Sequence, residues 1–172
     1  QAAAAGAIAA VNGGFFNIAN GGSVTYIRVN GIISDKDTAQ WENNSNRNGS
    51  ILIKGGKSVN IMEDMTNQWF DSQMEFEDVL VAGPLLLKDG EEVKLPETSL
   101  TVTRHPRTAV GMISKKKLML LTVDGRTSES LGMSLYELQD FLKLAGCRDG
   151  LNLDGGGSTT MWISGKPFNG VV

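Results

Sequence analysis

The chain contains few of the residues that usually reveal a mechanism, with one cysteine and one histidine among 172 residues. A single cysteine, Cys147, cannot form an intrachain disulfide, and no Cys and His cluster supplies the ligands of a zinc site. A Ser-His-Asp triad would have to use His105, and no nucleophile-elbow motif accompanies it. We therefore predict that the protein uses no metal and no cofactor.

Charge of one sign and long apolar runs are also lacking. The net charge is −3, which excludes general nucleic-acid binding through a basic surface. No apolar run approaches the roughly 20 residues that span a bilayer, so we predict no membrane span. Residues 1–10 are rich in alanine but lack the basic start of a signal peptide. The sequence leaves the oligomeric state open.

Glycine, by contrast, is abundant, with 21 residues that cluster near predicted turns. Apolar and alternating segments predict strands at 7–11 and 24–29 and a hairpin of 109–113 with 118–123. A further apolar stretch, 79–87, is interrupted by Gly83-Pro84 and predicts a bulge or a bent edge.

Helices are fewer. The strongest prediction is 135–145, because Ser134 and Glu137 form a capping box and Gly146 suits the C-terminal cap. Residues 62–70 predict a second, short helix. Together these patterns predict one α+β domain over residues 1–172, with a curved, mostly antiparallel sheet packed on a central helix.

The most informative segment is Asn-Leu-Asp-Gly-Gly-Gly-Ser-Thr-Thr at 152–160. Asn152 and Asp154 alternate with Leu153, so both point to one face of a short strand. The three glycines that follow suit a sharp turn or a backbone that lies against a ligand, and their N–H groups can form an anion-binding nest. The plainer alternative is a tight turn between two strands.

Six motifs, in this order, resemble the phosphodiester glycosidase family: NGGFF at 12–16, AGPLLLKDG at 82–90, RHPRTAVGM at 104–112, VDGR at 123–126, GMSLYEL at 132–138 and NLDGGGSTTMW at 152–162. The family includes a lysosomal enzyme that removes N-acetylglucosamine from phosphodiester-linked mannose, and bacterial proteins of exopolysaccharide or cell-wall metabolism. Family members usually have further strands before these motifs and a further segment after them, so the resemblance implies a domain trimmed at both ends.

The resemblance implies hydrolysis of a sugar 1-phosphodiester, or a related phosphorylated glycan, at the anomeric carbon, releasing free sugar and a phosphomonoester. Because the second pKa of the released phosphate is about 6, a protonating acid is less necessary than in an ordinary glycosidase. The site then needs cationic or N–H groups on the phosphate and one carboxylate near the anomeric carbon.

The carboxylate candidates are Asp124 and Asp154, each of which ends an apolar strand and precedes a glycine. We expect neighbouring strands to bring both to one edge of the sheet, and at least one to be catalytic. The sequence does not choose between them, although the glycine nest favours Asp154. The alternative is that either aspartate only caps its own turn.

The remaining candidates would hold the substrate. Arg107 and Arg126 are the phosphate candidates, because a guanidinium holds two phosphate oxygens in a planar fork; either could instead be a structural arginine. Sugar hydroxyls or phosphate would be held by Asn12, Gly13, Gly14, Asn152, Gly155, Gly156, Gly157, Ser158 and Thr159. His105 either touches the phosphate or fixes the turn before Pro106.

Two other functions fit the same residues. One is a phosphodiesterase that breaks the P–O bond, and the other is a non-catalytic glycan- or phosphate-binding module of an exopolysaccharide or cell-wall system. The resemblance also implies a secreted or periplasmic protein whose signal peptide has been removed. The identity of the sugar and the stereochemistry of the reaction stay open.

Overall fold

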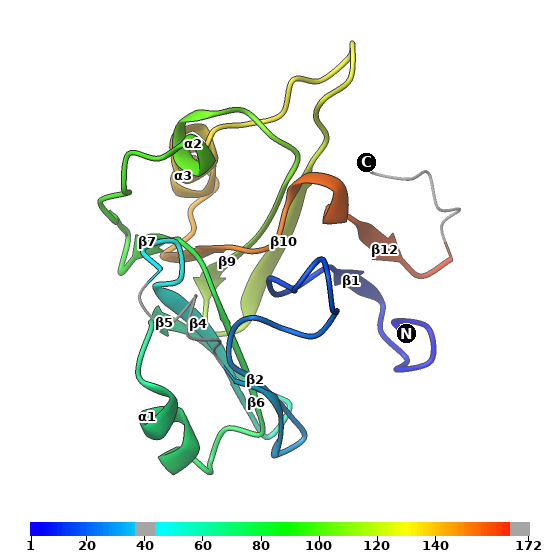
Figure 1. Cartoon of the computed structure of the whole chain (residues 1–172), viewed down its shortest axis with the longest axis vertical. Coiled ribbons are helices and arrows are strands. Elements are labelled where there is room, and N and C mark those ends of the chain that lie inside the picture. The colour runs from blue at the N-terminus through cyan, green and yellow to red at the C-terminus, as the bar shows by residue number, and fades with distance from the viewer. Residues whose placement is uncertain (37–43, 166–172) are drawn as a thin grey trace.

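The computed structural model describes residues 1–36 and 44–165, which form two five-stranded sheets and a two-stranded ribbon (Figure 1). In the described part, every pairing between named strands is antiparallel. The ribbon pairs β1 (Ala9–Val11) with β12 (Met161–Ile163). The predicted class, a mostly antiparallel α+β domain, is confirmed, but its strands form two sheets where we expected one.

We name each five-stranded sheet by the helix that covers it, α3 (Leu135–Leu144) or α1 (Asn67–Ser72). The α3 sheet has the order β10-β9-β11-β7-β8, with bounds Lys117–Val123, Arg107–Ser114, Asp149–Asn152, Leu85–Lys88 and Glu91–Glu92. The α1 sheet has the order β3-β2-β6-β4-β5, with bounds Ile32–Asp35, Ile27–Val29, Asp78–Ala82, Gly49–Lys54 and Ser58–Glu63.

Alternate side chains of each strand point to opposite faces of its sheet. The two sheets pack face to face and bury apolar side chains between them. The core between them contains Ile61, Ala82, Leu85, Val110, Leu151 and Leu153. The sheets approach closely at Gly49, where a Cβ atom would lie 2.3 Å from Leu151 Cδ1. A side chain at this position would displace the buried Leu151 side chain and crowd Leu85 Cβ at 3.3 Å.

Helices cover the outer faces of this sandwich. Helix α3 (Leu135–Leu144) buries Leu135, Leu138 and Leu142 against one sheet, and α2 (Ser99–Val102) lies beside it. Helix α1 (Asn67–Ser72) buries Phe70 against the outer face of the other sheet (Figure 1). The predicted capping box of α3 is confirmed, since Ser134 Oγ accepts from Glu137 N and Glu137 accepts from Ser134 N.

Two local predictions need correction. The short helix expected at 62–70 is wrong in its bounds: β5 extends to Glu63, and α1 begins at Asn67, after the N-cap Thr66. The stretch interrupted by Gly83-Pro84 is not a bent strand, because β6 belongs to the α1 sheet and β7 to the α3 sheet. The predicted hairpin is confirmed as β9 and β10.

None of the helices in the described ranges is long and apolar enough to cross a membrane.

Candidate active site

The candidate site lies where β9 begins and its two neighbours end. Val123, the last residue of β10, pairs with Arg107, and Leu153 N donates to Thr108 O at 2.9 Å just beyond β11. Asp124 and Asp154 therefore leave the same end of the α3 sheet, on either side of β9. The register brings together two acids that are 30 positions apart in the sequence.

Pro106 lies between the two Asp-Gly turns, and its backbone leaves no room for a side chain at Gly125 or Gly155. A Cβ on Gly125 would lie 2.8 Å from Pro106 N, and a Cβ on Gly155 would lie 2.8 Å from Pro106 O. Both atoms belong to the backbone, which cannot rotate away. The glycine after each aspartate thus lets both turns pack against one proline.

Asp154 is held at its backbone and at its carboxylate. Its N–H donates to Gly13 O at 2.9 Å, and its carbonyl accepts from Asn12 Nδ2 at 2.6 Å. Burial raises the pKa of the half-buried Asp154 carboxyl, and hydrogen bonds from Ser158 and from the Gly155 backbone partly offset this rise. A carboxylate that is more basic than usual suits proton transfer or attack on carbon.

Asn12 connects the strands of the site. Its Oδ1 accepts from Thr108 Oγ1 at 2.7 Å and from Thr160 N at 3.0 Å, while its Nδ2 donates to Asp154. Both functional atoms of Asn12 are therefore engaged by the protein. Besides the predicted contact with substrate, the geometry supports a second role for Asn12, which is to position the Asp154 loop.

Arg126 is exposed beside the glycine turn that follows Asp154. Its Nη2 atom would lie 3.5 Å from a Cβ on Gly156, which places the guanidinium over the first turn of the short 3-10 helix Gly156–Ser158. Arg126 itself has a φ of 61°, so the chain bends sharply at this position. Its exposed guanidinium can meet an anion next to the Gly156 backbone.

His105 supports this guanidinium. Its Nδ1 lies 3.2 Å from Arg126 Nη2, and because an arginine can only donate, Nδ1 acts as the acceptor. Burial lowers the pKa of His105, and the charges of Arg107 and Arg126 lower it further. All three effects favour the neutral imidazole that this hydrogen bond requires.

Arg107 departs from the expectation of a phosphate ligand. Its side chain is 2 % exposed; Nε donates to Met133 O at 2.8 Å, and Nη2 donates to Leu100 O at 2.7 Å and to Thr103 O at 2.8 Å. Burial and the charge of Arg126 lower the pKa of Arg107 to about 10. These carbonyls make Arg107 a structural residue beneath the site.

Two of the predicted polar ligands are also buried. Asn152 is 2 % exposed and donates from Nδ2 to Gly83 O at 2.8 Å, which ties β11 to the crossing between the sheets. Thr159 is 1 % exposed. Neither Asn152 Oδ1 nor Thr159 Oγ1 has a hydrogen-bond partner among the described residues. Both side chains face protein and are closed to a substrate in this structure.

The other candidates spread around the two acids. Asp124 is exposed, and its carbonyl accepts from Ser130 Oγ at 2.6 Å. Gly13 and Gly14 pack against the Leu80 side chain, and Gly157 faces open space. Within residues 1–36 and 44–165, no three His, Cys, Asp or Glu side chains gather in a way that could hold a metal ion.

Sequence reasoning missed Pro106 and Thr108 as parts of this site. Pro106 is the wedge between the two turns, and Thr108 donates to Asn12. Both lie in the RHPRT segment, in which only His105 and Arg107 were predicted as site residues. The two matched Asp-Gly pairs could have indicated Pro106, because two turns at the same end of a sheet must pack against a residue that lies between them.

The sequence profile of the phosphodiester glycosidases, a family of hydrolases, matches residues 5–171. The chain therefore belongs to the phosphodiester glycosidase family. Its relatives include N-acetylglucosamine-1-phosphodiester alpha-N-acetylglucosaminidase of Mus musculus, which is 27% identical over 169 residues, covering 94% of this chain and 32% of the mouse protein. The SPbeta prophage-derived uncharacterized protein YomE of Bacillus subtilis is 29% identical over 132 residues, covering 68% of this chain and 20% of YomE. The chain spans a third or less of the length of these two relatives.

Solved structures agree with the fold. The catalytic domain of the zebrafish N-acetylglucosamine-1-phosphodiester alpha-N-acetylglucosaminidase, auto-inhibited by its pro-peptide, superposes with a TM-score of 0.72 and 26% identity, covering 91% of this chain and 53% of that one. A hypothetical protein from Synechocystis shares the fold with a TM-score of 0.65 at 17% identity, covering 96% of this chain and 49% of that one.

Proposed function

We propose that the protein hydrolyses the C1–O bond of a sugar 1-phosphodiester and releases the free sugar and a phosphomonoester. The observation that carries this proposal is that Asp154, a half-buried carboxyl whose pKa is raised, lies two residues before Gly156, next to which the exposed guanidinium of Arg126 is placed. Membership of the phosphodiester glycosidase family supports it.

In the proposed reaction, the bond between the anomeric carbon and the phosphate oxygen breaks, and its electron pair stays on the phosphate. Arg126 would stabilise the negative charge that develops there, with the Gly155 to Gly157 backbone beside it. Asp154 would act at the anomeric carbon, either by attack or by removing a proton from the attacking water. Asp124, at the same end of the sheet, is the second carboxylate of the proposed site.

The positioning groups follow from the geometry. Asn12 and Gly13 hold the Asp154 backbone, and His105 accepts a hydrogen bond from Arg126. Neutral His105 keeps this acceptor, so we expect activity to fall when His105 is protonated. The pH profile of a His105→Gln variant tests this role, because an amide oxygen keeps an acceptor that does not titrate.

The substrate class is inferred from the family. The names of the vertebrate relatives make N-acetylglucosamine the first sugar to test. A role in exopolysaccharide or cell-wall metabolism, and a secreted or periplasmic location, belong to the proposal and rest on the family resemblance alone.

The decisive experiment is hydrolysis of a panel of sugar 1-phosphodiesters in ¹⁸O-labelled water, with mass spectrometry of both products. Label on the sugar is the expected result and means that the C–O bond breaks. Label on the phosphate would make the protein a phosphodiesterase. Ligand binding without turnover would favour a non-catalytic glycan- or phosphate-binding module.

Two aspartate variants assign the roles. We expect Asp154→Asn to lose rate far more than substrate affinity. Asp124→Asn shows whether the second carboxylate contributes. If neither variant lowers a demonstrated activity by about tenfold, roughly 1.4 kcal/mol of barrier, the assignment of both acids is wrong.

A further inference from the structure

We infer that an apolar groove beside Asp154 binds the alkyl part of the alcohol that is esterified to the phosphate. The groove has a volume of about 430 Å³ and lies on the inner face of the α1 sheet. The inference rests on the proposed function for the identity of the substrate. Its geometry stands independently.

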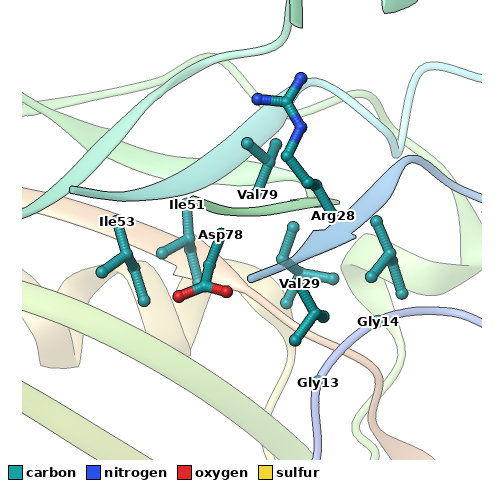
Figure 2. A pocket seen from close by; sticks show the side chains of 10 residues that line it. Gly13, Gly14, Arg28, Val29, Ile51, Ile53, Asp78 and Val79 are labelled. Atoms are coloured by element: carbon teal, nitrogen blue, oxygen red, sulfur yellow. The ribbon is translucent and has the colours of Figure 1, made fainter. Parts of the chain in front are cut away.

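The floor of the groove is a run of apolar side chains on three neighbouring strands. They are Ile27 and Val29 of β2, Leu80 of β6, and Ile51 and Ile53 of β4. Figure 2 shows Val29, Ile51 and Ile53 pointing to the side where Gly13 lies, while Arg28 and Val79 extend to the opposite side. The side chains therefore alternate between the two faces of the sheet, and these faces differ in how far they are buried.

The outer face of the α1 sheet is covered by a helix, whereas part of its inner face is exposed. On the outer face, Leu52, Val79 and Val81 are buried with Phe70 of α1. On the inner face, Val29 is 48 % exposed. Ile51 and Leu80 pack against the core between the sheets, so the groove is the open end of that core.

The wall nearest the candidate site is the Gly13-Gly14 backbone. A Cβ on Gly14 would lie 2.9 Å from Leu80 Cδ1, so this backbone rests directly on the floor. Gly13 O accepts the Asp154 N–H at 2.9 Å. This hydrogen bond joins the wall of the groove to the backbone of Asp154, the residue proposed to act at the anomeric carbon.

The chemistry of the lining selects one part of the substrate. Arg28 turns its guanidinium away, where Nη1 donates to Gln73 O at 2.8 Å and to Phe76 O at 3.1 Å. The other charged residue of the lining is Asp78, whose Oδ1 accepts from Asn30 N at 2.8 Å. A carboxylate repels phosphate, and apolar side chains leave sugar hydroxyls without partners.

An alkyl chain meets neither obstacle. The groove volume lies in the usual range of small-ligand sites, about 300–1,000 Å³. Each methylene that moves from water into the groove should tighten binding by up to about fourfold. Because the groove is partly open, we expect about tenfold or more in total from a methyl to a hexyl chain.

The test compares chain lengths in two assays. Methyl, butyl and hexyl phosphate are titrated into the protein by calorimetry, and kcat/KM is measured for the methyl, butyl and hexyl diesters of N-acetylglucosamine 1-phosphate. We expect both affinity and kcat/KM to rise with chain length. Val29→Ser should reduce this rise, and Val29→Trp, which fills the groove, should abolish it.

The matched control is Ile32→Ser on β3, an apolar residue of the same sheet that is 70 % exposed and lies outside the groove lining. It should keep the full dependence on chain length. Thermal unfolding of all three variants verifies that they are folded, which is expected because both positions are exposed. An equal loss in Ile32→Ser would overturn the inference.

The outcomes separate this inference from the proposed function. Binding that rises with chain length and depends on Val29, without hydrolysis of any ester, would support the groove and refute the reaction. Hydrolysis without any dependence on chain length would refute the groove and leave the reaction standing. Self-association that Val29→Trp abolishes would mean that a second copy of the chain covers the groove, and would also refute the inference.

Discussion

Replacing Asn12 with alanine should damage both the stability and the activity of the protein. The substitution removes three hydrogen bonds, to Thr108 Oγ1, Thr160 N and Asp154 O. At about 1 kcal/mol each, with a larger penalty where a buried partner is left unsatisfied, the free energy of unfolding should fall by about 2–4 kcal/mol. For a domain of this size, the midpoint temperature should fall by roughly 5–15 °C.

Asn17→Ala is the matched control. The Asn17 side chain also accepts two hydrogen bonds, from Ala19 N at 2.9 Å and Asn20 N at 3.1 Å, but these lie in an exposed turn. Its loss should lower the free energy of unfolding by at most about 1 kcal/mol. Urea denaturation of both variants, followed by circular dichroism, gives the comparison.

The activity of the folded Asn12→Ala variant completes the test. Because Asn12 holds the Asp154 carbonyl, we expect kcat to fall by about tenfold or more under conditions where the variant stays folded. A free energy of unfolding within about 0.5 kcal/mol of that of Asn17→Ala would refute the positioning role. So would an unchanged kcat.

Three further predictions concern the glycine turn, the arginines and the acid. Gly155→Ala should lower stability, because its Cβ would lie 2.8 Å from a backbone oxygen, whereas Gly157→Ala, with nothing within 4 Å, should leave stability nearly unchanged; thermal unfolding of the pair decides. Arg107→Met should lower the free energy of unfolding by about 3 kcal/mol or more, because it removes three hydrogen bonds of a buried guanidinium, and Arg126→Met should instead lower kcat/KM at nearly unchanged stability; the opposite pattern would exchange their roles. Burial raises the folded-state pKa of Asp154, so protonation of this carboxyl stabilises the folded protein. This stabilisation is complete below the unfolded pKa of about 3.9 and is lost as the pH rises through the folded pKa. Asp154→Asn should therefore be inactive yet more stable than the parent at pH 7, with the difference vanishing at low pH in urea denaturation; a variant that is less stable at pH 7 would contradict this.

Local patterns explain why several elements could be predicted. The capping box of α3 joins Ser134 to Glu137 within one helical turn, so neighbouring residues determine where the helix begins. The hairpin of β9 and β10 follows from two apolar strands with a short basic turn between them. The two Asp-Gly pairs could also be recognised, because each directly follows an apolar strand.

Long-range contacts decide what local patterns leave open. An arginine beside an apolar strand fits either a phosphate-binding or a structural role, and the burial of Arg107 depends on carbonyls of α2, its C-cap and the segment before α3. The crossing at Gly83-Pro84 looked like a bulge, since the sequence does not state which sheet each half of a broken strand joins.

The sequence by itself determined the family, the antiparallel class, the best helix and a set of residues that includes both acids, because these depend on local spacing and on motifs in order. Tertiary structure decided which of those residues can meet a substrate. It buried Arg107, Asn152 and Thr159 and left Arg126 exposed beside Asp154. The physical reason is that exposure and hydrogen-bond partners arise from segments far apart in the chain: Asn12 reaches the Asp154 loop across 142 positions, and only the folded register brings them together.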